Sequence, residues 1–116
     1  MSITIIAGSR TITDPQTVSD AVEKSGFNIE KIITGGCNGI DLLAEQYARL
    51  NNIPVEVFPA DWKKYGRAAG PVRNKQMAEH ADSLIAIMLE GGSKGTRSMI
   101  LEAEKKGLKI YVHIVR

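Results

Sequence analysis

The sequence predicts a single α/β domain, residues 1–116, in which a mainly parallel sheet of about five strands lies between two layers of helices. Five short apolar runs, rich in β-branched residues, alternate with four segments of helical periodicity. Most of these runs are apolar almost throughout, which is typical of strands buried on both faces. Regular alternation with short connections favours parallel strands joined by right-handed crossovers. A length of 116 residues suits one domain.

The individual elements follow from these runs and from helix start signals. The predicted strands are Ile3–Ala7, Ile29–Thr34, Pro54–Phe58, Ser83–Met88 and Lys109–Val115. The helical patterns begin at Pro15, Ile40, Gly70 and Thr96. We expect Thr96 to cap the last helix. The one long connection, Pro59–Ala69, receives no helix or strand, and a connection of that length in so small a domain is often functional.

Composition and charge exclude several classes of protein. Lys and Arg number 15 and Asp and Glu 13, and the resulting formal charge of +2 is no electrostatic footprint for nucleic acid or an anionic membrane. Aromatic residues make up 5%, which argues against a platform of stacking rings. A single cysteine rules out an internal disulfide and a four-thiolate zinc site, and we expect no metal and no cofactor. No apolar run is long enough to span a membrane and the start is no signal peptide, so we expect a cytoplasmic protein.

Glycine and polar residues gather on one side of the predicted sheet. The four strand-to-helix connections contain Gly8-Ser9-Arg10, Gly35–Gly39, Pro59–Gly70 and Glu90–Thr96. The helix-to-strand connections contain only ordinary stops. Because the carboxyl ends of parallel strands share one edge, where ligands bind, these loops predict a binding site there. Two loops with paired glycines favour a phosphate held by backbone N–H groups and helix N-termini; the alternative is that the glycines only make tight turns.

The predicted ligand contacts lie in these loops and at the starts of the helices that follow. They are Gly8, Ser9, Arg10, Gly35, Gly36, Asn38, Gly39, Asp41, Asp61, Trp62, Arg73, Asn74, Met77, Gly91, Gly92, Ser93, Gly95 and Thr96. Arg73 has two open roles: it neutralises a bound anion, or it is solvated or paired with Asp61 or Asp82. Asp41 either stabilises its helix start or accepts hydrogen bonds from sugar hydroxyls. Trp62 either stacks on a base or covers the end of the sheet.

Several motifs, taken in order, resemble a known family over nearly the whole chain. They are Gly8-Ser9-Arg10, Thr34-Gly35-Gly36-Cys37-Asn38-Gly39-Ile40-Asp41, Phe58-Pro59-Ala60-Asp61-Trp62, Ala69-Gly70-Pro71-Val72-Arg73-Asn74-Lys75-Gln76-Met77 and Gly91-Gly92-Ser93-Lys94-Gly95-Thr96. This set resembles the small YspA-type members of the SLOG superfamily. The resemblance implies a Rossmann-like sheet that binds nucleotides or nucleotide sugars at its carboxyl edge.

The wider superfamily includes the cytokinin-activating phosphoribohydrolases, the DNA-processing mediator DprA, and sensor domains of bacterial conflict systems. Some of these sensors bind ADP-ribose-type signals made from NAD, and members are often dimers. The resemblance therefore implies a small-molecule nucleotide ligand and a homo-oligomer. The charge of +2, the low aromatic content and the absence of a long apolar run make nucleic acid and membrane unexpected as partners.

One departure from the family bears on enzymatic activity. The phosphoribohydrolases carry Pro-Gly-Gly-x-Gly-Thr-x-x-Glu, whose Glu assists cleavage of an N-glycosidic bond. Here Glu90 stands in place of the Pro and Met99 in place of the Glu, and a thioether transfers no proton. This favours binding without hydrolysis and leaves no predicted catalytic residue, although Asp41 or Asp61 remains as another acid.

The leading interpretation is a binder of a phosphorylated nucleotide or an ADP-ribose-like signal, with sequestration in a conflict between bacterium and phage as its extension. The glycine loops and Thr96 would hold phosphates, Arg10 and Arg73 would neutralise charge, and Asp41 and Asn74 would contact ribose or base. Two alternatives stay open. One is a hydrolase or transferase acting on a nucleotide N-glycosidic bond, and the other is a DprA-like binder of single-stranded DNA.

Overall fold

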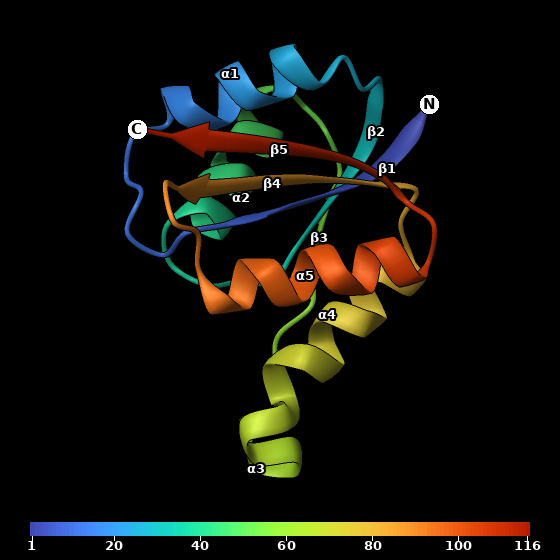
Figure 1. Ribbon diagram of the computed structural model, residues 1–116. Helices are drawn as coiled ribbons and strands as arrows, with labels where there is room; N and C mark the ends of the chain where they lie inside the picture. Colours follow the sequence, from blue (N-terminus) through green and yellow to red (C-terminus); the bar gives the residue numbers. More distant parts are fainter.

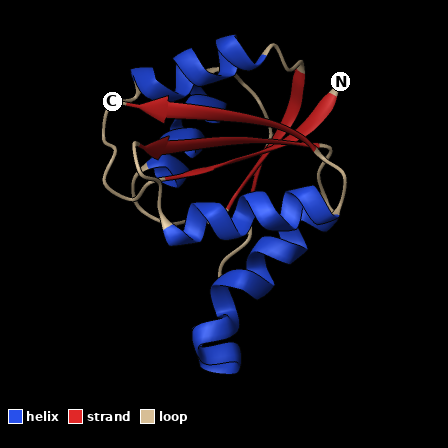
Figure 2. Cartoon of the chain, in the orientation of Figure 1, coloured by secondary structure: helices blue, strands red, loops and turns tan.

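A five-stranded parallel sheet forms the centre of the computed structural model, which describes all 116 residues (Figures 1 and 2). The strands are β1 (Ser2–Gly8), β2 (Ile29–Thr34), β3 (Val55–Val57), β4 (Ser83–Leu89) and β5 (Lys109–Val115). Their order across the sheet is β3-β2-β1-β4-β5, and every neighbouring pair is parallel. The predicted α/β architecture is therefore confirmed.

Helices cover both faces of this sheet. The helices are α1 (Gln16–Ser25), α2 (Ile40–Leu50), α3 (Trp62–Tyr65), α4 (Ala69–Glu79) and α5 (Lys94–Lys105). Helices α1 and α2 pack on one face and α4 and α5 on the other, as Figure 1 shows. None of them is both long and apolar enough to cross a membrane. The molecule thus has three layers, as the continuous apolar strands predict.

The central strand β1 shows why the strands are apolar on both sides. Ile5 and Ala7 contribute to the core under α4 and α5, whereas Ile6 contributes to the core under α1 and α2. Successive strand residues point to opposite faces, so a strand covered on both faces has no solvent-facing position. After β1 the chain places β2 and β3 on one side of β1, and it later places β4 and β5 on the other side of β1. The carboxyl ends of β1 and β4 therefore flank the switch point of the sheet, where open α/β sheets bind ligands.

The start of α5 differs from the prediction. Thr96 does not cap the helix; Ser93 is the N-cap, and its hydroxyl oxygen accepts a hydrogen bond from the Thr96 N–H at 3.3 Å. Serine and threonine are both favourable N-cap residues, and the N-cap is the one whose backbone angles are not helical. Ser93 has extended backbone angles, whereas Thr96 lies in the first turn.

The connection Pro59–Ala69 also differs from the expected irregular loop. It contains α3, followed by the 3-10 turn Gly66–Ala68 and the first residue of α4. The side chain of Asp61 accepts a hydrogen bond from the Lys64 N–H at 3.0 Å and so caps α3. In Figure 1 this segment projects from the body of the molecule below α4. A single turn of helix has too few residues for an apolar stripe, and its periodicity is therefore invisible in the sequence.

Gly8, the last residue of β1, lies where the backbones of two elements meet. A Cβ at this position would overlap the carbonyl oxygen of Ile87 in β4 and would lie 2.9 Å from the Ile40 side chain of α2. Only glycine therefore allows β1 to reach the switch point while α2 packs against it.

We expect Gly8→Ala to lower the free energy of unfolding by about 3 kcal/mol or more, since backbone must move to admit the methyl group. The measurement is urea denaturation followed by circular dichroism. Gly95→Ala is the matched control, because a Cβ there meets nothing within 4 Å, and its effect should stay below about 1 kcal/mol. Equal effects of the two substitutions would contradict this account of Gly8.

Candidate functional site

The largest cavity described lies over the carboxyl ends of β1 and β4 and has a volume of about 740 Å³. It is lined by Ala7, Gly8, Ser9, Arg10, Thr11, Cys37, Asp41, Trp62, Arg67, Gly70, Pro71, Arg73, Asn74, Met77, Leu89, Gly92, Ser93, Lys94, Gly95, Thr96 and Ser98. These residues come from the loops after β1, β2 and β4 and from the segment between β3 and the middle of α4. The volume of the cavity is within the range of small-molecule binding sites.

The structure brings most of the predicted contact residues together around this cavity. Those that line it are Gly8, Ser9, Arg10, Asp41, Trp62, Arg73, Asn74, Met77, Gly92, Ser93, Gly95 and Thr96. Those that do not are Gly35, Gly36, Asn38, Gly39, Asp61 and Gly91. The predicted site and the observed cavity thus overlap mainly in the loops after β1 and β4 and in α4.

Arg73 is the most constrained charged group of the cavity wall. It is only 8% exposed, and its Nη1 donates to the carbonyl oxygens of Gly35 at 2.7 Å and Phe58 at 3.3 Å. Its Nε donates to Oδ1 of Asn74 at 3.0 Å. No ion pair of the structure includes Arg73, so the pairing with Asp61 or Asp82 considered from the sequence is absent. These bonds use Nε and Nη1, whereas Nη2 has no acceptor within the protein, and the one carboxylate of the cavity wall, Asp41, forms no ion pair with Arg73.

The glycines of the loop after β2 shape this arrangement from behind the cavity. A Cβ on Gly35 would overlap Arg73 and lie 2.9 Å from Oδ2 of Asp41. Gly39 has a φ of 74°, and a Cβ on it would overlap the Ser9 backbone. The loop therefore approaches two neighbouring segments closely, and in this geometry its glycines serve packing and backbone conformation.

Asp41 is the one carboxylate in the cavity wall, and it is buried. Burial raises the pKa of Asp41 above its ordinary value of 3.8, because desolvation disfavours the charged form. The Cys37 N–H, which donates to Oδ2 at 3.2 Å, and the positive charge of Arg73 oppose this rise. A buried carboxylate facing a cavity can accept hydrogen bonds from sugar hydroxyls.

The first turn of α5 offers unpaired backbone donors to the same cavity. The Ser93 hydroxyl accepts the Thr96 N–H, and the N–H groups of Lys94 and Gly95 have no acceptor within the protein. Both residues line the cavity, and nothing lies within 4 Å of a Cβ on Gly95. Two free N–H groups at the positive end of a helix, beside the Lys94 ammonium group, form an arrangement that accepts an anion.

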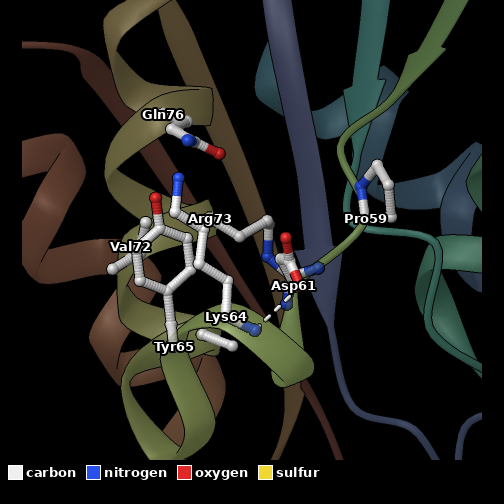
Figure 3. A pocket seen from close by; sticks show the side chains of 8 residues that line it. Pro59, Asp61, Lys64, Tyr65, Val72, Arg73 and Gln76 are labelled. Atoms are coloured by element: carbon white, nitrogen blue, oxygen red, sulfur yellow. Dashed lines mark hydrogen bonds between the residues drawn. The ribbon is translucent and has the colours of Figure 1, made fainter.

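A smaller hollow of about 290 Å³ is also lined by Arg73 (Figure 3). Its polar lining comes from Asp61, Lys64, Tyr65, Arg73 and Gln76. Figure 3 shows Asp61 held by its hydrogen bond from Lys64, so this carboxylate is occupied in capping α3. Asp61, Lys64, Tyr65 and Gln76 are exposed, so of the polar residues that line the hollow only Arg73 is buried.

The structure also adds residues that sequence reasoning missed. Lining residues outside the predicted set are Ala7, Thr11, Cys37, Arg67, Gly70, Pro71, Leu89, Lys94 and Ser98. The two cations among them, Arg67 and Lys94, lie next to Gly66 and Gly95 in connections already singled out. A search of those connections for basic residues would have found both. No group of three or more His, Cys, Asp or Glu side chains could hold a metal ion.

The raised pKa of Asp41 predicts a pH-dependent difference between the protein and its Asp41→Asn variant. A raised carboxyl pKa in the folded state contributes stability below about pH 4 that is lost as the pH rises through the folded-state value. The free energy of unfolding of the wild type should therefore fall relative to the variant as the pH rises from about 4 through the folded-state pKa of Asp41. Urea denaturation at several pH values measures this difference; a difference that stays constant would contradict the raised pKa.

Comparisons with known proteins identify the family. A model described as "YspA, cpYpsA-related SLOG family" matches residues 3–65, which is more than half of the chain. The "Gene 61 protein" of Mycobacterium phage D29 is 34% identical over 116 residues, covering 91% of each protein. The structure of DNA processing protein A (DprA) from Streptococcus pneumoniae matches 97% of this chain with a TM-score of 0.74 at 15% identity.

The present chain spans 50% of that DprA chain, and the likeness concerns the Rossmann-like fold. The ordered glycine motifs, the parallel sheet and the extent of the family match agree with one another. The chain therefore belongs to the YspA, cpYpsA-related SLOG family.

Proposed function

We propose that the protein binds a phosphorylated nucleotide or an ADP-ribose-like molecule in the cavity above β1 and β4. The observation that carries this proposal is the charge of the wall: Arg10, Arg67, Arg73 and Lys94 line it against a single carboxylate, Asp41. The whole chain has a formal charge of only +2, so positive charge is concentrated at this cavity. A wall with four cations and one carboxylate favours an anionic ligand.

The position of each group supports a division of the ligand into two parts. The free N–H groups of Lys94 and Gly95 and the guanidinium of Arg73 would contact phosphate oxygens. Asp41 would accept hydrogen bonds from a ribose. The side chains of Met77 and Trp62 would contact the base.

The surroundings of Met99 favour binding over hydrolysis of an N-glycosidic bond. Met99 is 1% exposed and packs in the core under α4 and α5, outside the cavity lining. The related hydrolases have a glutamate where this chain has Met99. Asp41 is the one acidic residue in the cavity wall. Binding without turnover would sequester a signal. The likeness to a phage protein supports sequestration in a conflict between bacterium and phage, and we place this activity in the cytoplasm, where Cys37 stays reduced.

Calorimetry with AMP, ADP, ADP-ribose, cyclic ADP-ribose and dinucleotides tests the proposal directly. We expect saturable binding, weakened roughly tenfold each by Arg10→Gln, Arg67→Gln and Lys94→Gln, the loss expected when one charge-assisted hydrogen bond is removed. Arg49→Gln is the control, because Arg49 is an exposed cation outside the cavity. The ligand should be recovered intact.

Three results would count against this proposal. Absence of binding across the panel at high protein concentration would overturn it. Release of free base would favour the hydrolase instead, and tight binding of a single-stranded oligonucleotide alone would favour the DNA binder.

Trp62, the only tryptophan of the chain, reports on the base-binding end of the cavity. Its side chain is 56% exposed, so a base placed against it should remove water from the indole. We expect nucleotides to change the fluorescence emission of Trp62 with the affinity that calorimetry measures. Inorganic pyrophosphate should bind without that change, since it lacks a base. Nucleotide binding that leaves the emission unaltered would contradict the placement of Trp62.

A further inference from the structure

The two edges of the sheet differ in how they are protected. The edge strand β3 has 3 residues, and its exposed Glu56 forms an ion pair with Lys31 at 2.6 Å. The other edge strand, β5, has 7 residues and no charged side chain between Ile110 and Val115. Short length and charge are the usual protection of a sheet edge, whereas β5 is longer than β3 and is charged only at its first residue, Lys109. In Figure 1, β4 is the strand beside β5, and α1 and α5 lie above and below this margin of the sheet.

The backbone of β5 has unpaired groups along this edge. The Lys109 N–H donates to the Asp82 carbonyl oxygen, and the Val115 carbonyl oxygen accepts from the Glu90 N–H, so these residues point toward β4. Successive residues of a strand alternate in direction. Ile110, Val112 and Ile114 therefore direct their N–H and C=O groups away from the sheet, where no residue of the chain bonds to them.

The same residues carry exposed apolar side chains. Ile110 packs against the core under α5, which places the side chains of Val112 and Ile114 on that face as well. Val112 is 39% and Ile114 41% exposed, because α5 covers this margin of the sheet only in part. Free hydrogen-bonding groups and uncovered apolar surface thus coincide on three alternate residues.

We propose that β5 is a homodimer interface, in which the β5 strands of two copies pair antiparallel about a two-fold axis and join the two sheets into one. An axis normal to the sheet keeps each face on its own side, so even-numbered residues oppose even-numbered ones. With Val112 opposite Val112 of the second copy, Ile110 opposes Ile114. Every outward N–H and C=O then has a partner, and Lys109 opposes Val115 rather than a like charge.

Charges on α5 match a second copy in the same arrangement. Two contacts mark the side of α5 that faces α4. Ser98 accepts a hydrogen bond from Asn74, and Lys106, directly after α5, forms an ion pair with Glu79. Helical periodicity places Arg97 and Glu104 on the opposite side, toward the β5 edge. The Arg97 guanidinium donates to the Gly91 carbonyl oxygen, and neither Arg97 nor Glu104 forms an ion pair within the chain. The two-fold axis runs the two α5 helices antiparallel, so Arg97 of each copy lies toward Glu104 of the other. An extended peptide would offer no such charge match.

Analytical ultracentrifugation of the full chain between about 1 and about 200 µM tests the interface, since dimerisation depends on concentration. We expect a dimer whose dissociation constant rises tenfold or more with Val112→Lys or Ile114→Lys. Leu50→Lys, on a side chain 83% exposed at the end of α2, should leave it unchanged. Glu104→Arg should weaken the dimer, and adding Arg97→Glu should restore it.

Hydrogen exchange keeps the test decisive if a lysine variant fails to fold. In the unsubstituted protein, the amides of Ile110, Val112 and Ile114 should be protected at high concentration and exchange on dilution, whereas the amides of Tyr111 and His113 stay protected throughout. A monomer at all concentrations would overturn the proposal. A dimer without concentration-dependent protection of these three amides would overturn it too, and so would protection that depends on a peptide or another protein.

Discussion

The buried guanidinium of Arg73 is the contact on which the ligand site depends. It joins three elements, because its donors bind the carbonyl oxygens that follow β2 and β3 while its own backbone belongs to α4. Gly35 is required beside it, since a side chain at that position would occupy the space of the guanidinium. These hydrogen bonds hold Arg73 in place without cancelling its charge. A site of this kind is organised before any ligand arrives, which reduces the entropy that binding must overcome.

The electrostatics of the cavity follow from this preorganisation. Three further cations come from separate connections, and the free N–H groups of the first turn of α5 add the positive end of a helix. Asp41 is the one acidic group in the wall. Burial raises the pKa of Asp41, and the positive charge of Arg73 lowers it. The balance of charge in the wall is positive whether or not Asp41 is ionised. That balance suits the anionic ligand proposed above, and the hydrophobic members of the wall suit the uncharged part of such a molecule.

The cavity and the β5 edge lie on different parts of the sheet. The cavity lies at the carboxyl ends of β1 and β4 in the middle of the sheet, whereas the unprotected strand β5 forms its lateral margin. Pairing through β5 would leave the cavity open. The strand order thus keeps the proposed ligand site and the proposed dimer interface apart within 116 residues, and the opposite margin ends in a short strand with an ion pair.

The sequence by itself determined the alternation of strands and helices, the parallel sheet and the edge of the sheet at which the glycine loops meet. Each of these depends on the local period of apolar residues or on glycine. Only the tertiary structure decided that Arg73 is buried and forms no ion pair, that Gly35 and Gly39 pack behind the cavity, and that Arg67 and Lys94 join its wall. It also showed α3, whose single turn depends on the cap from Asp61. The reason is that burial and the direction of a side chain depend on residues distant in the chain, whereas periodicity is a local property.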